Sequence, residues 1–225
     1  DQTDGKKYAV LELSSFQLHN FHELRVSPSI AIITNLYPDH LNRYPSMDLY
    51  RVDKEAICRY QKESDLCLYN IGNPGSVQIS RVSGARRVGY SAGICSDWET
   101  NLPGLHNLEN IAAMTTLIKE LGLEEAIARR VAKDFGGLPF RQEKIATHEG
   151  ITYINDTTAT TPVAAIKALQ AATGATIWIT GGDTKKLPFG ELITEVQNNQ
   201  KIKKIVILGS KNIPDYVERL KQVAQ

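Results

Sequence analysis

A carboxylate and two hydroxyls follow a short apolar run near the start of the chain, in the string Glu-Leu-Ser-Ser-Phe-Gln-Leu at residues 12–18. The run itself, residues 8–13, is predicted to be a strand. In open α/β sheets ligands bind beyond the carboxyl ends of strands, so Glu12 and the serines are placed to hold a hard cation or orient a polar substrate. The plainer alternative is that Ser14 or Ser15 caps the next helix.

A second polar cluster, Asp39 and His40, follows the apolar run at residues 30–34. Carboxylate and imidazole groups are metal ligands, and two clusters at the same edge of a sheet can share one site. A turn with an exposed histidine is the simpler alternative. Lys54 lies on a predicted helix further along, where most lysines are solvated.

Four further side chains could recognise a nucleotide. Asn107 and Asn110 stand one helical turn apart at the start of a predicted helix, so their amides could together read a purine edge or a phosphate; Asn107 could equally be a plain helix cap. The planar fork of Arg141 suits a phosphate, and Asp156, at the end of a predicted strand, can accept from a ribose hydroxyl.

Two more polar clusters follow strands in the last third of the chain. Threonines at residues 157–161 precede Pro162, which is also the pattern of a helix N-terminus. The pair of glycines at residues 181–182 allows close backbone approach, and Lys185 or Lys186 supplies a positive charge for a carboxylate. A tight connection with two exposed lysines is the alternative.

The elements that must position these side chains alternate between strands and helices, in the order of a doubly wound α/β fold. Continuous apolar runs predict strands buried on both faces at residues 8–13, 30–34, 66–69, 151–154, 176–180 and 205–208. Helical spacing predicts helices at residues 108–121, 162–172, 187–197 and 214–223. Glycines and a proline at residues 136–139 predict a hinge between a domain over 1–137 and another over 138–225.

Composition excludes several classes of protein. The chain has 26 Lys and Arg against 25 Asp and Glu, a formal charge of +1, so no strong field draws nucleic acid. No apolar run approaches the roughly 18 residues that a membrane span requires. The three cysteines, Cys58, Cys67 and Cys95, contain no Cys-x-x-Cys and predict a cytoplasmic protein without a disulfide framework.

Taken in this order, the motifs resemble those of the Mur ligase family, from residue 12 to about residue 208. The string at 12–18 is similar to that of the family member that adds D-glutamate to UDP-N-acetylmuramoyl-L-alanine in peptidoglycan precursor synthesis, through an acyl phosphate. The resemblance implies part of a three-layer, parallel-sheet ATP-binding domain, followed by part of a Rossmann-like domain that receives the amino acid. It also implies a cytoplasmic monomer that binds neither nucleic acid nor membrane.

The resemblance implies roles for particular residues. The catalytic groups, which would also bind Mg²⁺, are Glu12, His40 and, as a carbamate, Lys54. The contacts to ATP would come from Asn107, Asn110, Arg141 and Asp156. The contacts to the UDP-muramoyl substrate would come from Ser14 and Gln17, and those to D-glutamate from Thr160 and Lys185.

Two departures of the sequence from the family pattern change the chemistry. Where the family has Asp-Ser-Lys-Ala-Thr-Asn, residues 156–161 read Asp-Thr-Thr-Ala-Thr-Thr, so Thr158 replaces a lysine; Phe140 replaces a histidine before Arg141. Losing a cation leaves the choice of amino acid open, because a dicarboxylic substrate favours cationic partners.

The family's phosphate loop is also missing, since no Gly-Lys-Ser or Gly-Lys-Thr occurs in the sequence. We therefore expect a fragment of the enzyme that is inactive alone. Two alternatives remain open at this point. The first is another amide ligase on the same plan, of the folylpolyglutamate or cyanophycin synthetase type, and the second is a nucleotide-binding module without catalysis.

Overall fold

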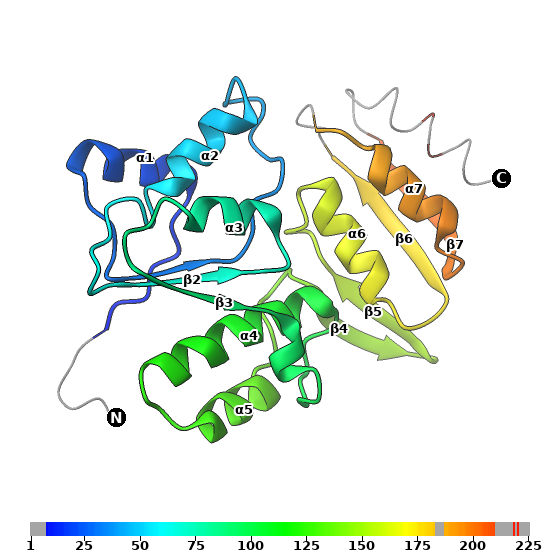
Figure 1. Ribbon diagram of the computed structural model, residues 1–225. Coiled ribbons are helices and arrows are strands. Elements are labelled where there is room, and N and C mark those ends of the chain that lie inside the picture. Colours follow the sequence, from blue (N-terminus) through cyan, green and yellow to red (C-terminus); the bar gives the residue numbers. More distant parts are fainter. Residues whose placement is uncertain (1–7, 183–186, 210–217, 219, 221–225) are drawn as a thin grey trace.

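The computed structural model describes residues 8–182, 187–209, 218 and 220, and shows strands alternating with helices (Figure 1). The helices are α1 (Ser15–Leu24), α2 (Met47–Glu55), α3 (Pro74–Ser80), the 3₁₀ helix η1 (Ala92–Cys95), α4 (Leu105–Glu120), α5 (Glu125–Asp134), α6 (Pro162–Ala171) and α7 (Gly190–Asn198). The strands are β1 (Ile30–Ile33), β2 (Leu66–Asn70), β3 (Arg86–Tyr90), β4 (Glu143–His148), β5 (Ile151–Asn155), β6 (Thr176–Gly181) and β7 (Ile202–Leu208).

The first sheet is the centre of three layers. Its strands are parallel, in the order β1-β2-β3. Helices α1, α2 and α3 lie on one side of it, and α4 and α5 lie on the other (Figure 1). Alternate side chains of β2 point to opposite faces, so Leu68 packs with α4 and Cys67 packs with Ile79 of α3. A sheet covered on both faces explains the continuous apolar strands of this part.

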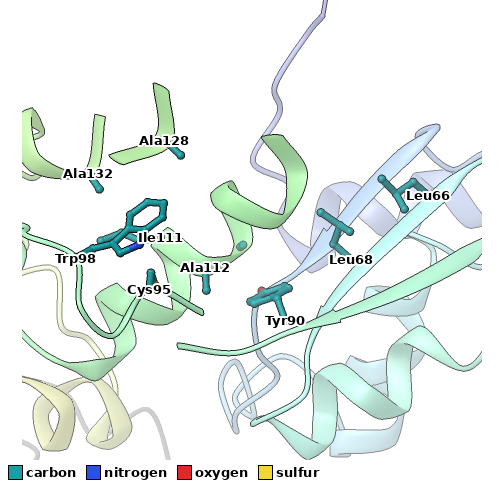
Figure 2. Close-up of a cluster of buried hydrophobic side chains, with 10 residues drawn as sticks. Leu66, Leu68, Tyr90, Cys95, Trp98, Ile111, Ala112, Ala128 and Ala132 are labelled. Carbon is teal, nitrogen blue, oxygen red and sulfur yellow. The ribbon is translucent and has the colours of Figure 1, made fainter. Parts of the chain in front are cut away.

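The larger core cluster joins the sheet to α4 and α5 (Figure 2). Leu66 and Leu68 from β2 meet Ile111 and Ala112 of α4, while Ala128 of α5 closes the far side. The alanines allow the two helices to approach closely, and Leu68 and Ala112 are fully buried. Burial of each large aliphatic side chain contributes about 1.5–3 kcal/mol, so this cluster fixes where α4 begins relative to the strand ends.

The second part contains a hairpin and a parallel pair of strands. Strands β4 and β5 are antiparallel and are joined through Glu149 and Gly150, both in the left-handed region. Strands β6 and β7 are parallel, and α6 and α7 cover one face of the pair. On the other face of β6, Ile177 and Ile179 are 61% and 62% exposed, so in the described chain only one face of this pair is covered.

The structure confirms the α/β class. The helices predicted over residues 108–121, 162–172 and 187–197 correspond to α4, α6 and α7. Two of the predicted strands differ from the structure. Residues 8–13 form no strand, because no described strand pairs with them, and Val10 and Leu11 are exposed. Residues 151–154 are a strand, but one in an exposed antiparallel hairpin rather than in a buried parallel sheet. The helix expected over 214–223 falls mostly outside the described residues.

The hinge over residues 136–139 and the domain boundary at 137 remain predictions. The segment between α5 and β4 does contain a residue in the left-handed region, Gly137 at φ 95°. None of the described helices is both long enough and apolar enough to cross a membrane. The three cysteines are all free and buried.

Candidate active site

A cavity of about 430 Å³ opens where the segment before α1, the loop after β1 and helix α2 meet. It collects residues that lie far apart in the sequence. Its walls are Glu12, Leu13, Ser14, Ser15, Gln17, Asp39, His40, Tyr50 and Lys54. The structure therefore brings together five of the predicted site residues, including all three expected to bind Mg²⁺.

Ser14 and Gln17 are bonded to each other at the start of α1. Ser14 Oγ accepts from the backbone N–H of Gln17 at 3.3 Å and donates to Gln17 Oε1 at 2.9 Å, and Gln17 Oε1 also accepts from the Ser14 N–H at 2.8 Å. This reciprocal arrangement satisfies two N–H groups that a helix start leaves unpaired. The capping alternative for Ser14 is thus confirmed, and any contact of this pair with substrate would be additional to it.

His40 is oriented by the aspartate before it. Asp39 Oδ1 accepts from the backbone N–H of His40 at 2.7 Å, and Asp39 Oδ2 lies 3.5 Å from His40 Nε2. His40 itself adopts φ 56°, an uncommon conformation that the two contacts with Asp39 help to hold. The rings of Phe16 and Tyr50 lie edge-on to the imidazole, at centroid distances of 5.2 and 6.0 Å. The exposed-histidine alternative is therefore too simple, because the ring is confined on several sides.

Lys54 is half-buried in the last turn of α2, which begins at the Ser46 cap. Its Nζ lies 5.7 Å from the centre of the Tyr50 ring. Burial lowers the pKa of Lys54, while the charges of Asp39 and Glu12 act in the opposite direction. Burial also raises the pKa of Tyr50 to about 12, so the phenol stays neutral near pH 7. Lys54 is thus not the solvated lysine of the simpler alternative.

The cavity offers two side chains, Glu12 and His40, that could hold a cation. Within the described residues, no three His, Cys, Asp or Glu side chains are close enough together to form a metal site. Glu12 and His40 nevertheless line one cavity, and Glu12 is close enough to Lys54 to act on its charge. Mg²⁺ at phosphate sites keeps several waters and uses one or two carboxylates, so this donor set suits it better than a closed metal site.

Two further predicted residues, Arg141 and Asp156, lie close together near His106 of α4. Asp156 is half-buried at the end of β5, and its Oδ1 accepts from the backbone N–H of Gln142 at 3.0 Å. Burial raises the pKa of Asp156, against the opposing influence of that bond and of the nearby His106 and Arg141 charges. The Arg141 side chain is exposed, and its charge acts on this carboxylate.

Asn107 and Asn110 lie in the first turns of α4, as predicted. Asn107 Nδ2 donates to the carbonyl of Pro103 at 2.7 Å, which ties the side chain to the turn before the helix. Asn110 is exposed, and no hydrogen bond joins its side chain to the rest of the described residues. Asn110 is thus the freer of the two amides for a ligand.

The residues expected at the amino acid are described only in part. Thr160 is exposed just before α6, whose cap is Thr161: its hydroxyl accepts from the N–H of Ala164 at 3.2 Å. The helix-start alternative for these threonines is therefore confirmed, with Pro162 in the first turn. Lys185 lies outside the described residues.

Comparison with known proteins decides the family. Residues 1–97 match the Mur ligase middle domain. The chain is 32% identical over 246 residues to the UDP-N-acetylmuramoylalanine--D-glutamate ligase of Roseiflexus sp. (strain RS-1), and 34% identical over 218 residues to that of Fervidobacterium nodosum. These alignments cover 95% and 96% of this chain. The chain belongs to the Mur ligase family.

Solved Mur ligases share the fold at lower sequence identity. The UDP-N-acetylmuramate-alanine ligase MurC of Thermotoga maritima superimposes with a TM-score of 0.65 at 20% identity, covering 94% of this chain and 52% of that one. MurF of the same organism, in complex with ADP, gives 0.61 at 16% identity and covers 90% and 57%. The chain spans about half the length of the curated Mur ligases it matches, at 52% and 50% of the two sequences above.

Three residues of this Mur ligase chain were not among the predicted site residues. Tyr50 lines the cavity beside the predicted Asp39, and His106 and Gln142 meet beside Asp156. The contact between His106 and Gln142 could not have been found from the sequence, because it depends on how the segment after α5 folds back onto α4.

Proposed function

We propose that the whole protein containing this chain is an ATP-dependent amide ligase that adds D-glutamate to UDP-N-acetylmuramoyl-L-alanine in the cytoplasm. The observation that carries this proposal is the meeting of Glu12, His40 and a half-buried Lys54 at one cavity. The name shared by the curated relatives supports the choice of substrates.

The cavity residues would have two different roles, binding the cation and supplying an anion beside it. Glu12 and His40 would hold Mg²⁺, which supplies charge neutralisation for phosphoryl transfer from ATP to the muramoyl carboxylate. Lys54 would act as a carbamate: its unprotonated Nζ bonds to CO₂ and one proton is released, so that a cation becomes an anion. Burial favours the unprotonated amine that this step needs.

The residues between α4 and β5 would hold the nucleotide. Asn107 and Asn110 would face the base, Arg141 the phosphates and Asp156 the ribose. The exposed guanidinium and the half-buried carboxylate next to it match the charge order of a nucleotide, with the anionic end at Arg141. Ser14 and Gln17 would face the muramoyl substrate. Thr160 and Lys185 would face the incoming amino acid.

The direct test is a ligase assay on the whole protein. Phosphate release would be followed with ATP, Mg²⁺ and UDP-N-acetylmuramoyl-L-alanine, against a panel of D- and L-amino acids. D-Glutamate should give the fastest turnover, and the 225-residue chain alone should give none. A different amino acid turned over fastest would redirect the proposal to another ligase of this plan, and absence of any ATP-dependent coupling would reject it.

A further inference from the structure

The segment that joins α5 to β4 is held in an uncommon backbone conformation. Phe140 and Gln142, on either side of Arg141, have φ of 64° and 45°. Non-glycine residues in the left-handed region cost about 1 kcal/mol or more each, and they persist where surrounding contacts hold them. The backbone on both sides of Arg141 is therefore fixed by contacts outside the segment.

One of those contacts comes from the carboxylate expected at the ribose. The N–H of Gln142 donates to Asp156 Oδ1 at 3.0 Å, so the same backbone group that follows Arg141 also orients Asp156. Arg141 adds a turn bond of its own, from its N–H to the carbonyl of Leu138 at 3.2 Å. The two charged groups expected at the nucleotide are thus joined through a single residue.

The side chain of Gln142 reaches in the other direction, to helix α4. Its Nε2 lies 3.1 Å from Nε2 of His106, within hydrogen-bond distance. Either the amide N–H donates to the ring nitrogen, or the amide is turned and its oxygen accepts from the ring N–H; both give one bond. Gln142 is half-buried, so losing this bond leaves a polar group without full access to water.

His106 offers a fixed partner for this bond. A Cβ on Gly104 would come within 2.8 Å of His106 Cε1 and 3.0 Å of Ala171 Cβ, so the glycine leaves the space that the ring and α6 occupy. Gly104 also has φ 89°, a conformation that side chains disfavour. The other ring nitrogen, Nδ1, is buried and has no hydrogen-bond partner in the part of the chain that the structure describes. The ring is therefore held by packing at one end and by Gln142 at the other.

We propose that Gln142 is a positioning residue, which through its bonds to His106 and Asp156 holds Arg141 and Asp156 in place relative to the asparagines at the start of α4. This inference rests on the proposed nucleotide site. Gln142 itself need not touch the nucleotide. Its role is to keep three nucleotide-facing elements, the joining segment, the end of β5 and the start of α4, at fixed mutual distances.

The test compares Gln142→Met with wild type in the whole protein. Methionine keeps the volume and removes the hydrogen bond. We expect the KM for ATP and the Kd for ADP, measured by calorimetry, to rise by about two- to tenfold with kcat changed less than about twofold. His106→Leu should do the same, and the double variant should be no worse than the weaker-binding single variant, because both remove one bond.

The matched control is Gln170→Met, since Gln170 is exposed and donates to Glu195 at 2.9 Å, in a bond that joins α6 to α7 and includes neither His106 nor Asp156. It should leave KM and Kd unchanged. An unaltered ADP affinity in Gln142→Met, with or without a lower thermal midpoint, would overturn the positioning role, and so would effects of the two single variants that multiply. Wild-type protein that binds ADP but does not ligate D-glutamate would reject the proposed function alone. Wild-type protein that binds no nucleotide would reject both.

Discussion

The hydroxyl of Thr158 donates a hydrogen bond to the carbonyl oxygen of Phe140 at 2.8 Å, and the backbone N–H of Thr158 donates to the same oxygen at 3.1 Å. Thr158 and Phe140 stand where the resembling Mur pattern has a lysine and a histidine. The carbonyl that the two bonds share belongs to a residue at φ 64°. The threonine at this position thus gives the segment between α5 and β4 a further side-chain hydrogen bond, in addition to the one from Gln142 N–H to Asp156.

Replacing Thr158 by valine should remove that side-chain hydrogen bond. Valine has the shape of threonine without the hydroxyl, and the bond from the backbone N–H remains. We expect a loss of about 1 kcal/mol in the free energy of unfolding, or a thermal midpoint lower by about 2–4 °C. Thr158→Ser keeps the hydroxyl and is the control. Equal midpoints for the valine and serine variants would show that the hydroxyl contributes nothing to the segment.

Replacing Thr158 by lysine tests the amino acid. If D-glutamate is the substrate, Thr158→Lys in the whole protein should lower its KM or leave it unchanged, because a cation is restored near a dicarboxylic ligand. One charged hydrogen bond corresponds to about one to two powers of ten in affinity. Thr158→Val separates the loss of the Phe140 bond from the gain of charge. A Thr158→Lys enzyme that is impaired with its native substrate, while Thr158→Val is not, would mean that the pocket suits another amino acid.

The sequence pattern grouped Glu12, His40 and Lys54 for a physical reason. Segments beyond the carboxyl ends of parallel strands gather at one edge of a sheet, and the structure places all three side chains at one cavity there. The strand predicted over residues 8–13 is absent, and Glu12 instead lies two residues before the Ser14 cap of α1. The grouping of these side chains therefore did not depend on that strand.

Two strands and one side-chain contact could not be predicted from the sequence. Strand β3 contains two arginines and a glycine, and β4 is exposed along most of its length, so neither shows the apolar run of a buried strand. The contact of Gln142 with His106 depends on the two left-handed residues, Phe140 and Gln142. No composition or spacing rule favours that conformation at phenylalanine or glutamine.

The imidazoles of His19 and His106 should titrate on opposite sides of the usual pKa of 6.5. The hydrogen bond and charge of Asp53, 3.1 Å from His19 Nδ1, raise the pKa of His19. Burial, with the positive charges of Lys167 and Arg141, lowers the pKa of His106 although Asp156 and Glu109 oppose it. An NMR titration of the chain would follow both rings. Asp53→Asn should bring His19 down and leave His106 unchanged.

The lowered pKa of His106 also predicts how the free energy of unfolding changes with pH. Because the folded state binds this proton less readily than the unfolded state does, the free energy of unfolding should fall as the pH drops below 6.5, until the folded-state pKa is passed. His106→Gln should flatten this part of the curve. A His106 that titrates above 6.5 would contradict the burial of its ring.

The ion pairs of Glu55, at the end of α2, should contribute strongly to the free energy of unfolding. Its carboxylate is 1% exposed and is paired with Arg51 and Arg59, which are 22% and 39% exposed. Replacing both arginines by methionine leaves a buried carboxylate without a cation and should cost about 3–5 kcal/mol in urea denaturation. Glu55→Gln should cost less, because the arginines can turn towards water. Lys133→Met, which removes an exposed pair with Glu99, should leave the midpoint unchanged.

Variants at Lys54 test whether the proposed reaction needs a carbamate anion at the end of α2. In the whole protein, Lys54→Ala should lose about 10²–10³-fold in kcat, the range found when one group that stabilises transition-state charge is removed. Bicarbonate should not restore the variant, because no amine remains to form a carbamate, whereas a small carboxylic acid that enters the cavity should restore part of the rate. Lys62→Ala, at an exposed lysine eight residues further on, is the matched control and should keep full activity. If Lys54→Ala is as active as Lys62→Ala, the half-buried Lys54 side chain over Tyr50 contributes only to packing, and the carbamate is rejected. That outcome would not affect the proposed nucleotide site, which the Gln142 variants test separately.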